Sequence, residues 1–275
     1  MRIRRIKRAA LAIILITLGL IYCLPFYFKL INSFKPLGEI LSSFLAFPSS
    51  PTLDNYRTAW EVINYPVIFL NTLIITVSTV ILAVLLSSMT GYMLERTGNR
   101  FSRIIYLYFV FGMIIPFFVI MVPLMQLISG LGLMNNRLVL ILYYVAGYVC
   151  FGTFMTYGFC RSIPREIEES ARIDGANVYQ IYMRIVMPLL TPATATLAIF
   201  FALWTWNDFI VAFLFMPMRE FRTISPALFW FVGDLRVEWD SLTASLVLTT
   251  TPILVFYACA QKYIEKGLAA GAIKG

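Results

Sequence analysis

Long apolar runs alternate with short charged segments along the whole chain. Each run is long enough to supply the about 20 helical residues that cross a hydrocarbon core. The pattern predicts an all-α, polytopic membrane protein, one transmembrane domain over residues 1–275 with six helices. The predicted spans cover about 9–31, 67–94, 104–127, 138–159, 191–215 and 243–263.

Two polar segments, 32–66 and 216–242, interrupt this pattern and are predicted to be external loops, the first with a short helix. Inside the third span, Pro116 and Pro123 each remove a backbone donor from the helix. Such prolines predict a bent helix whose freed carbonyl groups need other partners.

The distribution of charged residues predicts how the chain is oriented in the membrane. Only 13% of the residues are charged, against about a quarter in soluble proteins, and the net charge of +8 comes from bases at the ends of the spans. The lipid bilayer, and not a nucleic acid, is therefore the expected partner. The side richer in Lys and Arg is cytoplasmic, which predicts both termini and the segment 162–190 inside. That side carries Arg96, Arg100, Arg103, Arg161, Arg165, Arg172, Arg184, Lys262, Lys266 and Lys274, besides the N-terminal bases.

Several chemistries are excluded by what the sequence lacks. There is no histidine, the four cysteines form no C-x-x-C pair, and no G-x-x-x-x-G-K-[ST] phosphate loop occurs. Catalytic triads, zinc sites and nucleotide hydrolysis by this chain are therefore not expected. We predict a non-catalytic protein that binds no metal or cofactor itself.

The segment 162–190 is the longest charged, helix-patterned passage. Pro164 suits the first position of a helix, and the carboxylates that follow favour the positive end of its dipole. Gly175 predicts the end of that helix, and a second helical run, 178–187, is predicted to end at Pro188. From these features alone two interpretations stay open: a docking element for another protein, or an amphipathic connector lying on the bilayer.

The spacing within this segment resembles a known family. Glu169-Ser170-Ala171, then Gly175, Ile185 and Met187-Pro188 reproduce the intervals of the Glu-Ala-Ala loop found in permease subunits of ABC importers. Ser170 stands where the family has Ala and Met187 where it has Leu, and each is similar in size to the residue it replaces. Further motifs, in order, resemble the carbohydrate, maltose-type subgroup. These are Asn32-Ser33-Phe34-Lys35, Asp54-Asn55-Tyr56, Asn71-Thr72, Trp206-Asn207-Asp208 and the glycine-rich tail 267–275.

The resemblance implies a heteromeric importer in a bacterial-type cytoplasmic membrane. Its implied partners are a second homologous permease, two ABC ATPase subunits that use ATP and Mg²⁺, and an extracytoplasmic solute-binding protein. ATPase coupling would fall to Glu169, Ser170, Ala171, Arg172, Asp174, Gly175, Ile185 and Pro188, of which the last two hold the loop against the spans. The tail residues Gly271, Lys274 and Gly275 are further implied coupling positions, unless the terminus is without fixed structure.

Residues for a sugar pathway are sought among polar and aromatic side chains at membrane depth. The candidates are Asn71, Gln126, Tyr143, Tyr144, Trp204, Trp206, Asn207 and Asp208. An ionisable residue within a span is a functional hypothesis by default. For Asp208 two interpretations stay open: it faces the pathway, or it caps or bonds a neighbouring helix.

Two other classes of function compete with an ATP-driven importer. One is an ion-coupled secondary transporter or channel, which the near absence of carboxylates in the spans disfavours. The other is a membrane scaffold that uses the same loop only for docking. A requirement of uptake for ATP and a partner ATPase separates the importer from both.

Overall fold

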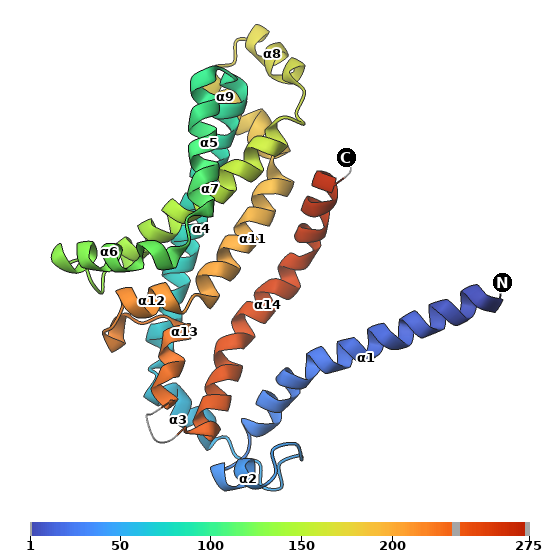
Figure 1. Cartoon of the computed structure of the whole chain (residues 1–275), viewed down its shortest axis with the longest axis vertical. Helices are drawn as coiled ribbons and strands as arrows, with labels where there is room; N and C mark the ends of the chain where they lie inside the picture. Colours follow the sequence, from blue (N-terminus) through green and yellow to red (C-terminus); the bar gives the residue numbers. More distant parts are fainter. Residues whose placement is uncertain (1, 233–236, 273–275) are drawn as a thin grey trace. The chain divides into compact units, whose positions relative to one another are not determined.

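The computed structural model describes residues 2–232 and 237–272, with side chains omitted at 2–6, 9 and 262–272. The described elements are helical, apart from one isolated antiparallel bridge between Val232 and Val237. The chain divides into two compact units, which are described separately. Figure 1 labels the elements of both.

The first unit comprises Met1–Pro66 and Leu228–Pro252. It contains α1 (Arg2–Asn32), α2 (Leu37–Ser42), α3 (Asp54–Val62), the start of α4 (Tyr65–Thr97), the 3₁₀ turn η3 (Leu228–Phe231) and the first half of α14 (Trp239–Ala272). The short helix expected within 32–66 is thus present twice, as α2 and α3.

A buried lysine organises the polar loop of this unit. Lys35 is 0% exposed, and its ammonium group donates to Oδ1 of Asn32 at 3.1 Å and to the carbonyl oxygen of Ser43 at 2.8 Å. The amide of Asn55 in α3 donates in turn to the carbonyl oxygen of Lys35 at 2.8 Å. Two short motifs that carry the family resemblance therefore bond to each other and fix the loop between α1 and α3.

The second unit comprises Val67–Ala227 and Ile253–Gly275. Besides most of α4 and the end of α14 it contains the long helices α5 (Arg100–Ile114), α6 (Phe117–Gly130), α7 (Arg137–Cys160) and α11 (Thr191–Asn207). The shorter elements are α8 (Arg165–Ile173), α9 (Val178–Ile181), the π turn η1 (Tyr182–Val186), α10 (Met187–Leu189), α12 (Ile210–Phe215), η2 (Arg219–Phe221) and α13 (Ile224–Ala227).

Glycines let α4 and α7 pack closely in this unit. A Cβ atom added at Gly91 would lie 2.8 Å from the backbone nitrogen of Tyr157, and one at Gly152 would collide with the side chain of Ser87. Small residues at such crossings permit the van der Waals contact that holds helices together within lipid. Beside this crossing lies a buried core that includes Ile75, Ala83, Leu140, Leu197, Phe201 and Phe215.

The predicted spans correspond to four unbroken helices and two bent pairs. Among the residues that the structure describes, four helices are long and apolar enough to cross a membrane, and the number rises to six if each bent pair is one span. The third run breaks at Pro116, where α5 and α6 meet at 93°; this is a right-angled break and not the modest bend of a single helix. Val178–Leu189 and Thr191–Asn207 form the second pair, bent by 75°.

The prediction of one continuous helix over 191–215, for the fifth span, was wrong. Helix α11 ends at Asn207, Asp208 takes an extended backbone conformation, and a separate helix α12 begins at Ile210. The side chain of Asp208 explains the break, because its Oδ2 accepts a hydrogen bond from the backbone N–H of Ala212 at 3.0 Å and so caps the new helix.

Candidate functional site

The segment 162–190 folds as a helix, a tight turn and a second helical stretch. Pro164 directly precedes α8, and Glu166 and Glu168 lie in its first turn. Carboxylates at this end of a helix are favoured by its dipole. The predicted start of the helix is therefore confirmed to within one residue.

Glu168 anchors α8 to the end of α4. It is only 3% exposed; its Oε2 accepts from the hydroxyl of Tyr92 at 2.8 Å, and its Oε1 accepts from Nε of Arg96 at 2.7 Å. Arg96 also donates through Nη2 to the carbonyl oxygen of Ile163 at 3.0 Å. A buried carboxylate is stable only when it is paired and hydrogen-bonded in this way. The contact fixes the position of α8 relative to α4.

Gly175 ends α8 as predicted. Its φ of +86° lies in the left-handed region. The N–H of Gly175 donates to the carbonyl oxygen of Arg172 at 3.0 Å, and the N–H of Ala176 donates to the carbonyl oxygen of Ala171 at 2.9 Å. These two bonds define a Schellman motif, in which glycine avoids the strain that a Cβ atom would bring. A Cβ atom added at Gly175 would meet nothing within 4 Å, so the turn is open to a partner surface.

The second stretch differs from the prediction of a helix closed at Pro188. The side chains of Asn177 and Gln180 form a capping box at the start of α9, after which the π turn η1 leads into α10, which continues to Leu189. The π turn η1 is wider than a regular α-helical turn and directly precedes Pro188. The missing N–H of this proline would otherwise interrupt the hydrogen bonds of a regular α-helix. Ile185 is half-buried and Pro188 is exposed.

This second stretch packs against the same helix ends as α8. Ile181, Tyr182 and Val186 are buried in a cluster with Tyr92 and Cys160. The hydroxyl of Tyr182 lies 2.8 Å from that of Ser88 in α4, a hydrogen bond between the two side chains. Both arms of the segment are therefore held by α4 and by the end of α7.

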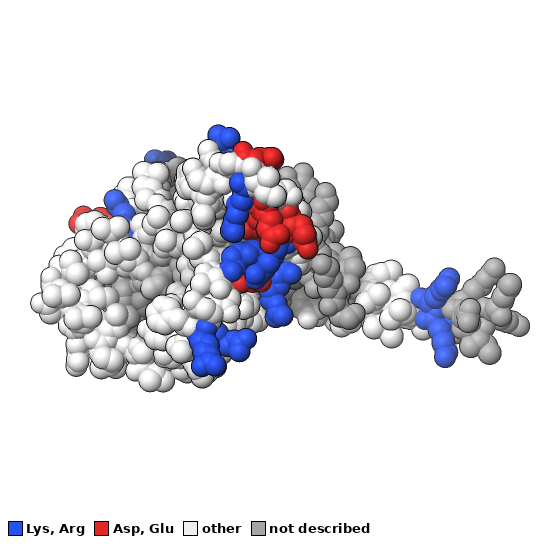
Figure 2. Space-filling view, turned by 90° about the horizontal axis from the view of Figure 1, so that it is seen from above, with Lys and Arg blue, Asp and Glu red and all other residues white. Residues whose placement is uncertain are grey.

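The outer face of α8 carries the remaining coupling candidates. Glu169, Ser170, Arg172 and Asp174 are exposed and Ala171 is half-buried. Among the residues that the structure describes, none of these charged side chains forms an ion pair. Figure 2, seen from this end, shows acidic and basic side chains gathered side by side. The arrangement presents unpaired charges on a rigidly anchored helix.

The pathway candidates separate into groups. Tyr143, Tyr144 and Asp208 come together, with the hydroxyl of Tyr144 donating to Oδ2 of Asp208 at 2.7 Å. This bond, with the cap on α12, corresponds to the second of the two roles considered for Asp208. Asn71 binds the carbonyl oxygen of Glu220 instead, at 2.9 Å.

Three other pathway candidates have different partners. Trp206 is buried against Phe69, with ring centroids 5.9 Å apart. Asn207 is exposed and donates to the carbonyl oxygen of Leu203 in its own helix at 2.8 Å. Gln126 is exposed on α6, and the structure does not bring it to Asp208.

Sequence reasoning named Trp204 but missed the aromatic cluster between α7 and α11 to which it belongs. Tyr148 stacks on Phe201 with ring centroids 4.9 Å apart and meets Trp204 at 5.5 Å. Trp204 also stacks on Phe200 at 5.9 Å and is 43% exposed. The spacing of Tyr144 and Tyr148, one helical turn apart, was the available signal.

The structure describes little of the three coupling candidates in the tail. Gly271 lies within α14, in the part of that helix whose side chains are not described, and Lys274 and Gly275 lie outside the described residues.

Comparison with known proteins gives consistent matches. The profile of the family described as "Binding-protein-dependent transport system inner membrane component" matches residues 83–270. The probable starch degradation products transport system permease protein AmyC of Thermoanaerobacterium thermosulfurigenes is 36% identical over 100% of both chains. The melibiose/raffinose/stachyose import permease protein MelC of Bacillus subtilis is 33% identical over 99% of this chain and 100% of its own.

A solved structure is similar in fold. One chain of a bacterial ABC transporter involved in the import of the acidic polysaccharide alginate aligns with a TM-score of 0.85. The alignment covers 96% of this chain and 98% of that one, at 23% identity. At this identity the likeness concerns the fold alone.

Proposed function

Because the chain belongs to the family of inner membrane components of binding-protein-dependent transport systems, we propose that it forms a sugar pathway with a second homologous permease. It is a multi-pass permease subunit of an ABC transporter in the bacterial cytoplasmic membrane. In the proposed assembly, two ATPase subunits bind ATP and Mg²⁺ and dock on the segment 162–190, while an extracytoplasmic solute-binding protein delivers the substrate. This chain contributes no catalytic group and binds no cofactor.

The observation that carries the proposal is the buried contact of Glu168 with Tyr92 and Arg96. A docking helix transmits motion only if it cannot slide on the spans beneath it. Both carboxylate oxygens of Glu168 are bonded to α4, so a displacement of α8 must move α4 as well. The exposed charges of Glu169, Arg172 and Asp174 then set the register with the ATPase, because unpaired rim charges favour complementary partners.

A sugar or oligosaccharide is the proposed substrate. The names of the relatives, for starch degradation products and for melibiose, raffinose and stachyose, support this class. The apolar faces of sugar rings stack on aromatic side chains, and the edge-to-face pair of Tyr148 and Trp204 offers such a surface. In this proposal Asp208 shapes the pathway indirectly, since it holds Tyr144 and the first turn of α12.

The experiment that tests this function uses proteoliposomes with the complete proposed complex, assembled from this chain, a second permease, the ATPase and the binding protein. Uptake of labelled maltotriose and raffinose is measured with and without ATP, and with each partner omitted in turn. We expect uptake of at least one of these sugars only when all components and ATP are present. Uptake by this chain alone, without ATP, would overturn the proposal in favour of a secondary transporter.

Gly175→Asp tests the docking role within the same complex. The added carboxylate would point into open space on the docking turn, so we expect uptake and stimulated ATP hydrolysis to be lost while the protein still inserts. Gly175→Asn is the matched control, because asparagine has the same size, carries no charge and tolerates left-handed backbone. Transport at the parental rate in Gly175→Asp would show that ATPases do not dock at this turn.

A further inference from the structure

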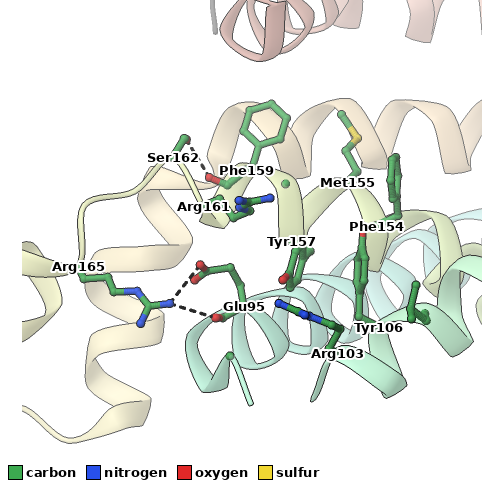
Figure 3. A pocket seen from close by; sticks show the side chains of 13 residues that line it. Glu95, Arg103, Tyr106, Phe154, Met155, Tyr157, Phe159, Arg161, Ser162 and Arg165 are labelled. Atoms are coloured by element: carbon green, nitrogen blue, oxygen red, sulfur yellow. Dashed lines mark hydrogen bonds and ion pairs between the residues drawn. The ribbon is translucent and has the colours of Figure 1, made fainter. Parts of the chain in front are cut away.

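A groove lies beside the docking segment, between the end of α4, the start of α5 and the end of α7. Its cavity volume is about 870 Å³. Figure 3 shows the side chains of Arg103 and Arg161 extending into the same space as Tyr106 and Tyr157, with Arg165 at its edge. The two tyrosine rings stack on each other with centroids 4.1 Å apart and form one wall.

The groove is electrostatically positive. Three arginines line it, against the single carboxylate of Glu95. That carboxylate is already engaged, because Arg96 and Arg165 both donate to it. Among the described residues, Arg103 and Arg161 form no ion pair. Two guanidinium groups thus meet in one cavity with no acidic side chain to balance them, an arrangement suited to an anion with several oxygen acceptors.

The same groove becomes apolar further along both helices. Leu107 lies one turn beyond Arg103 on α5, and Phe154 lies two turns before Arg161 on α7. These side chains are 44% and 45% exposed, and they lie about 6 and 10 Å along the helix axes from the arginines at 1.5 Å per residue. A ligand that fills the groove must therefore carry an anionic group at one end and an apolar chain at the other.

We propose that this groove binds an anionic glycerophospholipid of the cytoplasmic leaflet. Its phosphate lies between Arg103 and Arg161, and one acyl chain follows Leu107 and Phe154. Basic pockets between transmembrane helices on the cytoplasmic side select such headgroups. The inference rests on the orientation in the proposed function, which places the segment 162–190 inside. Arg165, the first residue of α8, lines the groove and donates to Glu95 in α4. The lipid therefore lies directly against the segment 162–190.

The test measures lipid binding to the purified full-length chain by native mass spectrometry, with dioleoyl-phosphatidylglycerol and dioleoyl-phosphatidylcholine as probes. We expect the phosphatidylglycerol to bind more tightly. Arg103→Gln and Arg161→Gln should each weaken its binding about fivefold, the usual share of one base near a membrane surface. Arg100→Gln is the matched control, since it removes the same charge from the same helix but does not line the groove.

A second pair of variants blocks the groove without changing its charge. Gly158 lines the groove, and a Cβ atom added there meets nothing within 4 Å, so Gly158→Leu fills the cavity while favouring the helix. Gly147→Leu is its control on the same helix, also in open space but outside the groove. We expect phosphatidylglycerol binding to fall at least fivefold in the first variant and to stay unchanged in the second.

Three results would overturn the inference. They are equal binding of both lipids, equal losses in the arginine variants and in Arg100→Gln, and binding of glycerol 3-phosphate as tight as that of the lipid. The last would identify a soluble phosphate as the ligand. Lipid binding requires neither ATP nor partner subunits, so failure here and failure of the proposed transport function are separate outcomes.

Discussion

The contact of Glu168 with α4 gives the sharpest prediction about this chain. In Glu168→Gln, the Tyr92 hydroxyl keeps an oxygen acceptor, while Arg96 loses a charged partner at 2.7 Å and retains Glu95. Hydrogen bonds to charged groups contribute about 1.5–3 kcal/mol. Glu168→Ala leaves Tyr92 and Arg96 both without that acceptor in a buried site, where the loss of one partner of an ion pair costs about 3–5 kcal/mol.

A cysteine beneath this contact makes the loss measurable. Cys160 is buried, 0% exposed, in the cluster under the segment 162–190. In a background where Cys23, Cys150 and Cys259 are replaced by serine, its labelling by a thiol reagent reports local opening of the segment. When reclosing is fast, the labelling rate rises with the opening equilibrium. We therefore expect labelling about 10- to 150-fold faster in Glu168→Gln, and faster still in Glu168→Ala.

Glu166→Gln serves as the control, because Glu166 is exposed on the same helix and its charge contributes little there. Its labelling rate should match that of the parent. If Glu168→Ala labels Cys160 within twofold of the parent rate, the anchor does not hold the segment, and the argument that docking motion passes through α4 is refuted.

Three further predictions concern packing and hydrogen bonding. Gly91→Ala should lower the melting temperature in detergent, because overpacking costs about 1–3 kcal/mol and the new Cβ would lie 2.8 Å from the backbone nitrogen of Tyr157; Gly147→Ala, in open space, should not. Asp208→Ala should destabilise the chain by about 1 kcal/mol through loss of the cap on α12, and further because the Tyr144 hydroxyl loses its acceptor, seen as a lower melting temperature; an unchanged value would show that both bonds are dispensable. Lys35→Met should speed chymotryptic cleavage within 43–53, because the acceptors that its ammonium group satisfies lose their donor; unchanged cleavage would show that other bonds order the loop.

The apolar pattern and a few local signals predicted much of the fold. The runs of apolar residues located the long helices, since helices satisfy their own backbone groups within lipid. Pro116 marked a real break, and Gly175 marked the end of α8, because each of these residues acts on the backbone within its own turn. Features that depend on one residue and its immediate neighbours are legible in a sequence.

Features that depend on partners distant in the sequence could not be predicted. Glu168 and Glu169 look alike in the sequence, yet one is buried against Tyr92 and Arg96, more than 70 positions away, and the other is exposed. Asp208 lies in an apolar run that predicts a continuous helix, and only its bonds to Tyr144 and to the turn of α12 explain the break. The choice between such alternatives is made by tertiary contacts.

The break at Pro116 also bears on how the chain enters the membrane. Helix α5 has 15 residues and α6 has 14, which makes them about 22 and 21 Å long, shorter than the about 30 Å hydrocarbon core. Neither can insert as an independent helix, and the backbone groups freed between them cannot face lipid. Helix α7 packs along α5, with Sγ of Cys150 beside Gly112. We therefore expect α5 and α6 to be retained at the translocon until α7 has been synthesised, so that biogenesis of this region proceeds by groups of helices and not one span at a time.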